Sequence, residues 1–259
     1  MTAAASPVPA APSLPLRTQI SIFVRMLAIQ GAWNYETLMG NGIGFCLEPA
    51  LRLLPGGVHG AEFKSALARE SRYFNAHPYL AAVAVGALAR VELDREPPDR
   101  IERFRTALCG PLGSVGDRLV WAGWLPFCSL ASLALFGLGG DPVVVVGFFL
   151  VAYNLGHVAL RVWGLRTGWR YGLRVATALA NPVLRHGPQQ IGRVAALATG
   201  VAIPLAIWRI IGPGRPLLGG VLVTVAVLSF ILVRLQGRIE GWRLSLIVLA
   251  GFVLFSVLR

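Results

Sequence analysis

Five long apolar runs in the second half of the sequence constrain its fold more than any other feature. They cover residues 119–139, 143–160, 191–211, 216–233 and 243–258. Each is close to the roughly 20 residues that a tilted helix needs to cross about 30 Å of hydrocarbon. Hydrophobic residues make up 55% of the chain and charged residues only 14%, which is typical of a membrane protein. The sequence therefore predicts an all-α membrane protein with about five transmembrane helices.

The positive charges lie mainly between these runs and predict how the chain crosses the membrane. There are 24 Lys and Arg residues against 12 Asp and Glu residues, which gives a net charge of +12. Arginines concentrate before residue 119, in 161–190 and in 234–243, whereas the connections 139–142 and 212–215 are short and contain one arginine between them. Cytoplasmic loops carry such an excess, so we expect a bacterial inner-membrane protein with a cytoplasmic N-terminus and an external C-terminus. The sequence has no interleaved basic and aromatic surface motif, and nucleic acid is not an expected partner.

The first half of the chain is organised differently and divides into two predicted regions. Residues 1–17 are rich in Ala and Pro and lack the basic start and unbroken apolar core of a secretory signal, so we expect a disordered tail. Residues 18–118 mix charged amphipathic segments, such as 60–77, with short apolar pieces. Those pieces are too short to cross a bilayer and favour amphipathic and re-entrant helices on the cytoplasmic side. They cover residues 43–54, 79–91 and 107–117, and the transmembrane region follows at 119–259.

Residues 107–125 have the most unusual composition of the chain. Gly110, Pro111 and Gly116 interrupt an otherwise apolar stretch directly before the first long apolar run. Irregular backbone in lipid leaves N–H and C=O groups unpaired, and it persists only where protein or a polar cavity satisfies them. We therefore expect a broken helix that helps to line a solute path, with Asp117 facing that path. Asp117 can equally be the N-cap of the helix that follows it, and both roles stay open.

The sequence contains no pattern that is typical of catalysis or metal binding. Cys46, Cys109 and Cys128 lack metal-ligand spacing and are expected to be buried free thiols. The glycines before Asp117 lack the Gly-Lys-Ser/Thr ending of a phosphate-binding loop. No nucleophile and base stand at catalytic spacing. We therefore expect no metal, no cofactor and no catalytic residue on this chain, and a stand-alone enzyme that uses Asp117 and His77 is disfavoured.

Four motifs occur in order over residues 20–175. They are Arg25–Glu36 (RMLAIQGAWNYE), Tyr73–Tyr79 (YFNAHPY), Glu92 after a short apolar stretch, and Gly110–Asp117 (GPLGSVGD) followed by Trp121. Together they resemble the signature of the IID subunit of mannose/fructose/sorbose-type sugar phosphotransferase permeases, which depend on phosphoenolpyruvate. The last eighty residues resemble that family only in hydrophobic character.

The resemblance implies a role in sugar transport. IID is the obligate partner of a IIC membrane subunit, and the pair moves a hexose by alternating access to the cytoplasmic IIB subunit, which phosphorylates it. A higher oligomer of IIC–IID pairs is implied, and IID itself is not phosphorylated. The arginines after the second apolar run follow from topology alone, or they dock IIB or anionic membrane lipid. They are Arg161, Arg166, Arg170 and Arg174.

This sequence departs from the family pattern in several places. Thr37, Glu48 and Arg118 stand where the family has other residue types, and Gly113 and Ser114 reverse the usual order of small residues. These departures keep an alternative open, in which the chain is a non-transporting membrane scaffold or regulator that descends from IID.

The candidate site residues come from the motifs, and each has a functional and a structural interpretation. Trp33, Asn34 and Glu36 combine a ring, an amide and a carboxylate as sugar sites do, but they also suit a helix anchor and a helix contact. His77 suits a proton relay near neutral pH, or it only orders the turn at Pro78. The residues expected at a substrate path or subunit interface are Trp33, Asn34, Glu36, Asn75, His77, Gly110, Pro111, Gly116 and Asp117.

Overall fold

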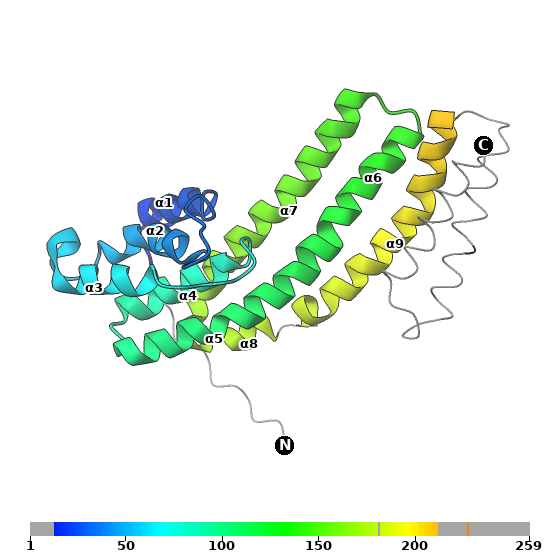
Figure 1. Ribbon diagram of the computed structural model, residues 1–259. Helices are drawn as coiled ribbons and strands as arrows, with labels where there is room; N and C mark the ends of the chain where they lie inside the picture. Colours follow the sequence, from blue (N-terminus) through cyan, green and yellow to red (C-terminus); the bar gives the residue numbers. More distant parts are fainter. Residues whose placement is uncertain (1–12, 181, 212–226, 228–259) are drawn as a thin grey trace, which may run out of the picture.

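The computed structural model of the chain describes residues 13–180, 182–211 and 227. Figure 1 shows a body of short helices at one end and long helical segments that run side by side away from it. Within the described residues the regular elements are all helical, and the β-type pairing is confined to two isolated bridges that involve Leu38.

The short helices pack into a body with its own hydrophobic core. Their bounds are Leu16–Met26 for α1, Gly40–Leu51 for α2, Ala61–Glu70 for α3 and Ala81–Leu93 for α4, with a 3-10 turn at Gly57–His59. α4 is the centre of this body, because all of its residues are buried except Arg90 and Leu93, which are half-buried. An apolar helix that is covered all round is a core helix.

A glycine seam holds α4 against the long helix α7 (Pro142–Tyr171). A Cβ atom added at Gly168 of α7 would lie 2.1 Å from the Val83 carbonyl oxygen, and one added at Gly86 of α4 would lie 2.2 Å from the Leu165 carbonyl oxygen. Backbones approach this closely only where neither residue has a side chain. The seam therefore packs the body closely against a helix that is long enough to span a bilayer.

A second long helix runs without a break from Pro98 to Gly137. It consists of α5 (Pro98–Gly116), the π-helical segment η2 (Asp117–Trp124) and α6 (Leu125–Gly137). The predicted broken helix and re-entrant turn over 107–117 are therefore wrong. A continuous helix satisfies its backbone groups internally, which is the favourable solution in an apolar environment.

Two further predictions change with this helix. Asp117 is not an N-cap, because the helix Pro98–Gly137 continues through it from α5 into η2. The predicted boundary between residues 118 and 119 also falls inside the continuous helix. The departure from regular α-helix takes the form of a π-helical segment, and π-helical turns are frequent at functional sites.

The remaining long segment is α9 (Pro182–Ile211), which packs along α6. It follows a 3-10 turn at Gly172–Arg174 and the short α8 (Val175–Leu179) at the end of α7. A Cβ atom added at Gly137 of α6 would lie 2.5 Å from the Leu205 Cβ of α9, so a glycine again allows two long helices to approach closely.

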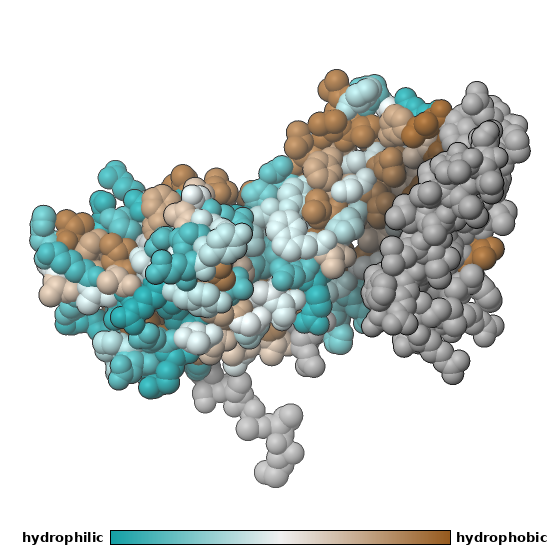
Figure 2. Space-filling view, viewed as in Figure 1, coloured by the Kyte–Doolittle hydropathy of each residue, from teal (hydrophilic) through white to brown (hydrophobic). Residues whose placement is uncertain are grey.

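Three described helices are long and apolar enough to cross a membrane: Pro98–Gly137, Pro142–Leu179 and His186–Ile210. They contain all of the apolar run predicted over 143–160 and nearly all of those over 119–139 and 191–211, so the chain is an all-α membrane protein as predicted. The other two predicted spans, 216–233 and 243–258, lie outside the described residues. Figure 2 shows hydrophilic residues mainly over the short-helix body and hydrophobic residues over the far parts of α6 and α7.

Several predicted element boundaries need correction. The predicted loop over 161–190 is largely helical, because α7 continues to Tyr171. The predicted helix over 60–77 ends at Glu70, and the chain then runs without regular helix to the start of α4. The apolar pieces at 43–54 and 79–91 form most of α2 and α4, which are buried in the short-helix body. Their placement as re-entrant helices stays a prediction.

Candidate functional site

The residues that directly follow the first motif are joined through their backbones to the motif Tyr73–Tyr79. The Phe74 amide donates to the Thr37 carbonyl oxygen at 3.1 Å, and the Met39 amide donates to the Phe74 carbonyl oxygen at 3.0 Å. Asn34 orders the first of these loops, because its Oδ1 accepts hydrogen bonds from the amides of Glu36 and Thr37, each at 2.9 Å. This is an Asx turn, and it commits the Asn34 side chain to the fold of its own loop.

His77 of the motif Tyr73–Tyr79 packs against Gly116 of the glycine motif. Its side chain is only 1% exposed. A Cβ atom added at Gly116 would lie 2.2 Å from the His77 Cβ, so the histidine packs directly on the backbone of the long helix. Its ring centroid lies 4.9 Å from that of Trp121 and 5.1 Å from that of Tyr79. Gly116 is therefore needed as a contact surface for His77 and not as a helix break.

The environment of His77 keeps its ring neutral. Nδ1 accepts a hydrogen bond from the Tyr79 amide at 3.2 Å, which places the proton of the neutral ring on Nε2. Burial, and after it the positive charge of Arg161, lower the pKa of His77 to about 4. A neutral and buried imidazole favours the turn-ordering interpretation over a relay of protons or phosphoryl groups.

A row of polar side chains on α7 faces the same aromatic cluster. Tyr153, His157 and Arg161 recur at four-residue spacing and share one face of the helix. Tyr79 contacts all three of them. Its hydroxyl lies 2.7 Å from the Tyr153 hydroxyl, its ring stacks on that of His157 with centroids 5.0 Å apart, and the Arg161 guanidinium lies 4.4 Å from its ring centroid.

Arg161 is a buried cation that holds two parts of the chain together. It is 4% exposed, and its Nε and Nη2 donate to the Met26 carbonyl oxygen at 3.2 and 3.1 Å. Met26 is the last residue of α1, so this contact attaches the end of α1 to α7. No carboxylate within the described ranges forms an ion pair with Arg161. The carbonyl oxygen, the Tyr79 ring and an imidazole nitrogen stabilise its charge instead.

The polar contacts continue from Arg161 along α7 towards the apolar part of the helix. Arg161 Nη1 lies 3.1 Å from His157 Nδ1, and because a guanidinium only donates, the imidazole accepts at Nδ1 and carries its proton on Nε2. His157 Nε2 then donates to Asn154 Oδ1 at 2.8 Å. We call Tyr153, Asn154, His157 and Arg161 the α7 polar stripe.

The α7 polar stripe ends on an open surface. Asn154 is exposed, and Leu155 beside it is 65% exposed. Polar side chains on a membrane-spanning helix face a partner, a water-filled cavity or one another, because hydrocarbon does not solvate them. Among the residues that the structure describes, no group of three or more His, Cys, Asp or Glu side chains is arranged to hold a metal ion. The arrangement is therefore suited to binding and packing within the membrane.

The structure brings together only part of the predicted site. His77 and Gly116 are in direct contact, and Trp33 packs edge-on against Tyr35 with ring centroids 4.9 Å apart. Apart from Asn34, the remaining members of the set are all exposed. These residues are Glu36, Asn75, Asp117, Gly110 and Pro111. The side chains of the polar members Glu36, Asn75 and Asp117 form no ion pair and accept no hydrogen bond from a described residue.

Sequence reasoning missed most of the α7 polar stripe. The notable signal was the recurrence of Tyr153, His157 and Arg161 at four-residue spacing, which places them on one helix face. Asn154 and His157 are polar residues inside an apolar run, but nothing in the sequence connects them to Tyr79. That connection depends on a contact between residues that are more than seventy positions apart.

Three apolar helices beside a compact helical body define the chain as an integral membrane protein. The chain belongs to the PTS system mannose/fructose/sorbose family IID component, whose family model matches residues 14–207. This match contains all four motifs, and it confirms the resemblance that they predicted. The chain is thus a membrane subunit of a sugar transporter family.

Individual relatives agree with this assignment. The mannose-specific EIID component of Escherichia coli is 29% identical over 204 residues, which cover 73% of this chain and 70% of the relative. The fructose permease IID component of Bacillus subtilis is 28% identical over 205 residues, which cover 73% and 72% of the two chains. A chain in the cryo-EM structure of the mannose transporter ManYZ with a microcin has a TM-score of 0.57 and 21% identity, with 95% of this chain and 96% of that chain covered. A second solved membrane protein has a TM-score of 0.67, 20% identity and the same coverage. The two structures support the fold.

Proposed function

We propose that this chain is the IID subunit of a mannose-type sugar permease in the bacterial inner membrane. It pairs with a IIC subunit, and the IIC–IID pair moves a hexose that the cytoplasmic IIB subunit phosphorylates. Several such pairs form the complete assembly. The family membership and the mannose and fructose permease relatives support this proposal.

The proposed pairing with IIC is supported by the exposed end of the α7 polar stripe. Asn154 lies on a helix whose apolar part has no residue buried inside this chain. The Asn154 amide is hydrogen-bonded within α7, because Nδ2 donates to the Leu150 carbonyl oxygen at 2.6 Å and Oδ1 accepts from His157 at 2.8 Å. Its polar surface nevertheless favours a protein or hydrated surface over hydrocarbon. We infer that a IIC subunit, or a hydrated path between IIC and this chain, covers this surface. Exposed apolar residues on both sides of Asn154, Val151 and Leu155, complete the face that IIC would contact.

The distribution of charge supports a cytoplasmic position for the short-helix body. Arg166, Arg170 and Arg174 lie at the end of α7 that adjoins the body. The opposite end of α7 begins after Asp141, and Val143 there is 81% exposed. Arginines accumulate on the cytoplasmic side of inner-membrane proteins, so the body and the N-terminus are assigned to that side.

In this proposal the chain does not carry the phosphoryl group. His77 is buried under Trp121 and Tyr79 and lies out of reach of a phosphocarrier protein. The contribution of the chain is a rigid wall, in which Arg161 and Tyr79 fix the position of α7 relative to the body. Alternating access requires such a fixed unit, against which the partner moves.

Substitution of Asn154 tests the proposal in cells that also express the IIC and IIB partners. We expect Asn154→Leu to weaken co-purification with IIC and to lower uptake of a labelled hexose by about tenfold, which corresponds to roughly 1.4 kcal/mol of lost interaction. Val143→Ala is the matched control, because it alters an exposed apolar position of the same helix that lies away from the polar stripe. It is expected to keep at least half of the uptake, an order-of-magnitude estimate for a surface substitution.

Three outcomes would contradict parts of the proposal. Normal uptake and co-purification by Asn154→Leu would remove the α7 polar stripe from the interface. Stable binding to IIC without uptake of any hexose would favour the non-transporting scaffold or regulator. A wild-type chain that never co-purifies with IIC would contradict the pairing itself.

A further inference from the structure

We propose that the junction of η2, α7, α8 and α9 is a binding slot for one anionic phospholipid. The slot has a cationic compartment for the phosphate group and an apolar compartment for acyl chains, and the two compartments share Trp163. The inference requires only that the chain lies in a bilayer, and it is independent of the proposed transport.

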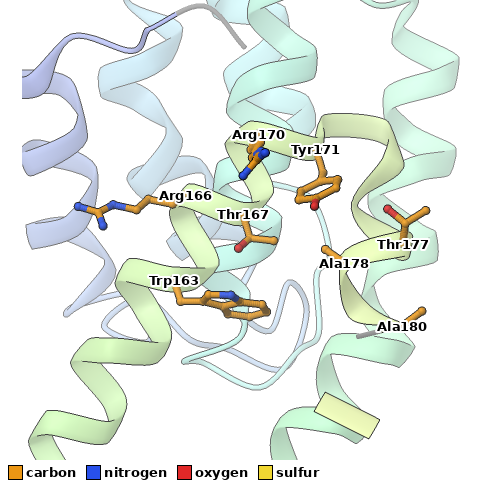
Figure 3. A pocket seen from close by; sticks show the side chains of 8 residues that line it. All are labelled: Trp163, Arg166, Thr167, Arg170, Tyr171, Thr177, Ala178 and Ala180. Carbon is orange, nitrogen blue, oxygen red and sulfur yellow. The ribbon is translucent and has the colours of Figure 1, made fainter. Parts of the chain in front are cut away.

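The cationic compartment is a pocket of about 580 Å³ between the end of α7 and α8. Figure 3 shows Trp163, Thr167 and Tyr171 of α7 across the pocket from Thr177 and Ala178 of α8. The Thr167 hydroxyl makes no hydrogen bond within the described part of the chain, so it is available to a ligand oxygen. Hydroxyl and aromatic groups at the edge of a membrane helix suit a lipid headgroup.

Two arginines supply positive charge to this compartment. Arg170 is directed towards Thr167 and Arg166 extends outwards from the rim (Figure 3). Neither forms an ion pair with a carboxylate in the ranges that the structure describes. The acids that line the neighbouring pocket with Arg170 are already paired: Asp94 accepts from Arg90 at 2.6 Å, and Glu96 from Arg100 at 2.8 Å. The charge that remains favours an anionic ligand.

The apolar compartment is a cavity of about 460 Å³ on the other side of Trp163. Leu119 and Trp124 of η2, Ala159 and Leu160 of α7, and Leu184 and Ile191 of α9 are among its lining residues. A free phosphate ion or an acidic protein surface would occupy the cationic compartment and leave the apolar cavity unfilled. A phospholipid has both parts in the same order, with the phosphate next to its acyl chains.

The position of the slot along α7 agrees with this assignment. Trp163 follows the apolar run 143–160, and the arginines come next. Tryptophan and tyrosine collect at the level of lipid headgroups, and arginines on the cytoplasmic side attract anionic lipids. The two compartments therefore lie in the order in which a bilayer presents acyl chains and phosphate groups.

Lipid binding to the full chain, purified in mild detergent with the subunits that accompany it, tests the proposal. After delipidation, phosphatidylglycerol or phosphatidylcholine is added in mixed micelles, and bound lipid is counted by native mass spectrometry. We expect the wild type to retain phosphatidylglycerol about tenfold better than phosphatidylcholine. Inorganic phosphate alone is expected not to displace it.

Three variants separate the compartments. The double variant Arg166→Gln and Arg170→Gln removes the charge, and Ala159→Phe fills the apolar compartment without a change of charge; each is expected to reduce phosphatidylglycerol binding about tenfold. Arg174→Gln is the control, because Arg174 lines the neighbouring pocket and not the slot. It is expected to bind lipid as the wild type does. The thermal midpoint of each variant without added lipid distinguishes a misfolded chain from an empty slot.

Four results would overturn the proposal. They are equal binding of the two lipids, equal loss in Arg174→Gln, displacement of the lipid by inorganic phosphate alone, and unchanged lipid binding in both slot variants. Loss of IIB binding together with unchanged lipid binding would instead assign the arginines to a protein partner.

Discussion

The short-helix body and the long helices bury their apolar residues in opposite ways. In the body, α4 is covered on every side by other parts of the same chain. In α7, none of the most apolar window is buried within the chain, and in α9 only 17% of the corresponding window is. The body thus completes its own core, whereas the long helices present their apolar surface to lipid and to other subunits.

Polar groups follow the same division. In the body, buried charges are paired within the chain, as Arg69 is with Glu92 at 2.7 Å and Arg105 with Glu70 at 3.1 Å. On α7, the polar stripe contacts Tyr79 and Met26 near the body, whereas at its other end the exposed Asn154 is bonded only to residues of its own helix, His157 and Leu150. The comparison teaches that stability is contained in the body, while the interaction surface lies on the helix that the body holds in place.

The largest effect is expected where the two regions meet. Gly168→Leu places a side chain against the Val83 carbonyl oxygen, where even a Cβ atom would lie at 2.1 Å, so α4 and α7 must separate. We expect no folded protein, measured as the yield of monodisperse material extracted from membranes. Gly147→Leu is the matched control on the same helix, because a Cβ atom there meets nothing within 4 Å. Similar yields for the two variants would contradict the seam.

The next largest difference is expected between a buried ion pair and an exposed one. The side chains of Arg105 and Glu70 are 5% and 0% exposed, whereas those of Arg72 and Glu102 are 63% and 50% exposed. Arg105→Gln leaves Glu70 buried without its partner and is expected to destabilise the fold by about 3–5 kcal/mol. Arg72→Gln is expected to change it by less than about 1 kcal/mol. Denaturation monitored by circular dichroism measures the change in the free energy of unfolding for both variants. Equal changes would contradict the burial of the Arg105–Glu70 pair.

These expectations show which parts of the molecule its sequence could predict. The spans at 119–139 and 143–160 follow from length and hydrophobicity, which are local properties, and the described structure confirms them. The same information could not distinguish α4 from a half-membrane helix, because both are short and apolar. That choice depends on Gly164 and Gly168, which are about eighty positions away and allow α7 to cover it.

The candidate site was predictable to a similar extent. The motif Tyr73–Tyr79 contains His77, which is buried against Trp121 and Tyr79, and its place at a substrate path stays a prediction. The glycine motif was interpreted as a break because Gly and Pro weaken an isolated helix. Whether they break it depends on what lies beside them, since Gly116 faces His77 whereas Gly110 faces no other part of the described chain. Arg161 was assigned to a loop, and its contact with Met26 was not foreseeable from spacing.

The contribution of His77 to the pH dependence of stability is expected to be smaller. Its pKa is lowered from 6.5 to about 4 in the folded chain, mainly by burial. Above pH 6.5 the ring is neutral in both states and the contribution of His77 to stability is fully present. As the pH falls below 6.5, His77 becomes protonated in the unfolded chain but stays neutral in the folded chain. The free energy of unfolding therefore decreases until about pH 4, by up to about 3 kcal/mol. His77→Gln should flatten this part of the profile relative to the wild type, in thermal midpoints measured from pH 7 to pH 4. Parallel profiles would show that His77 is not held neutral.

The smallest effect distinguishes Gly110 from Gly116, two of the three glycines of the motif. Gly110 is exposed on α5, and a Cβ atom there meets nothing within 4 Å. In a continuous helix Gly110→Ala should raise stability by up to about 1 kcal/mol, because alanine is the better helix former. Gly116→Ala should lower it by about 1–3 kcal/mol, because the new methyl group meets His77. If both substitutions destabilise the isolated chain equally, the helix is broken at this motif after all. If Gly110→Ala stabilises the chain but weakens its binding to IIC, the exposed glycine belongs to the interaction surface, and the division between body and interface extends to α5.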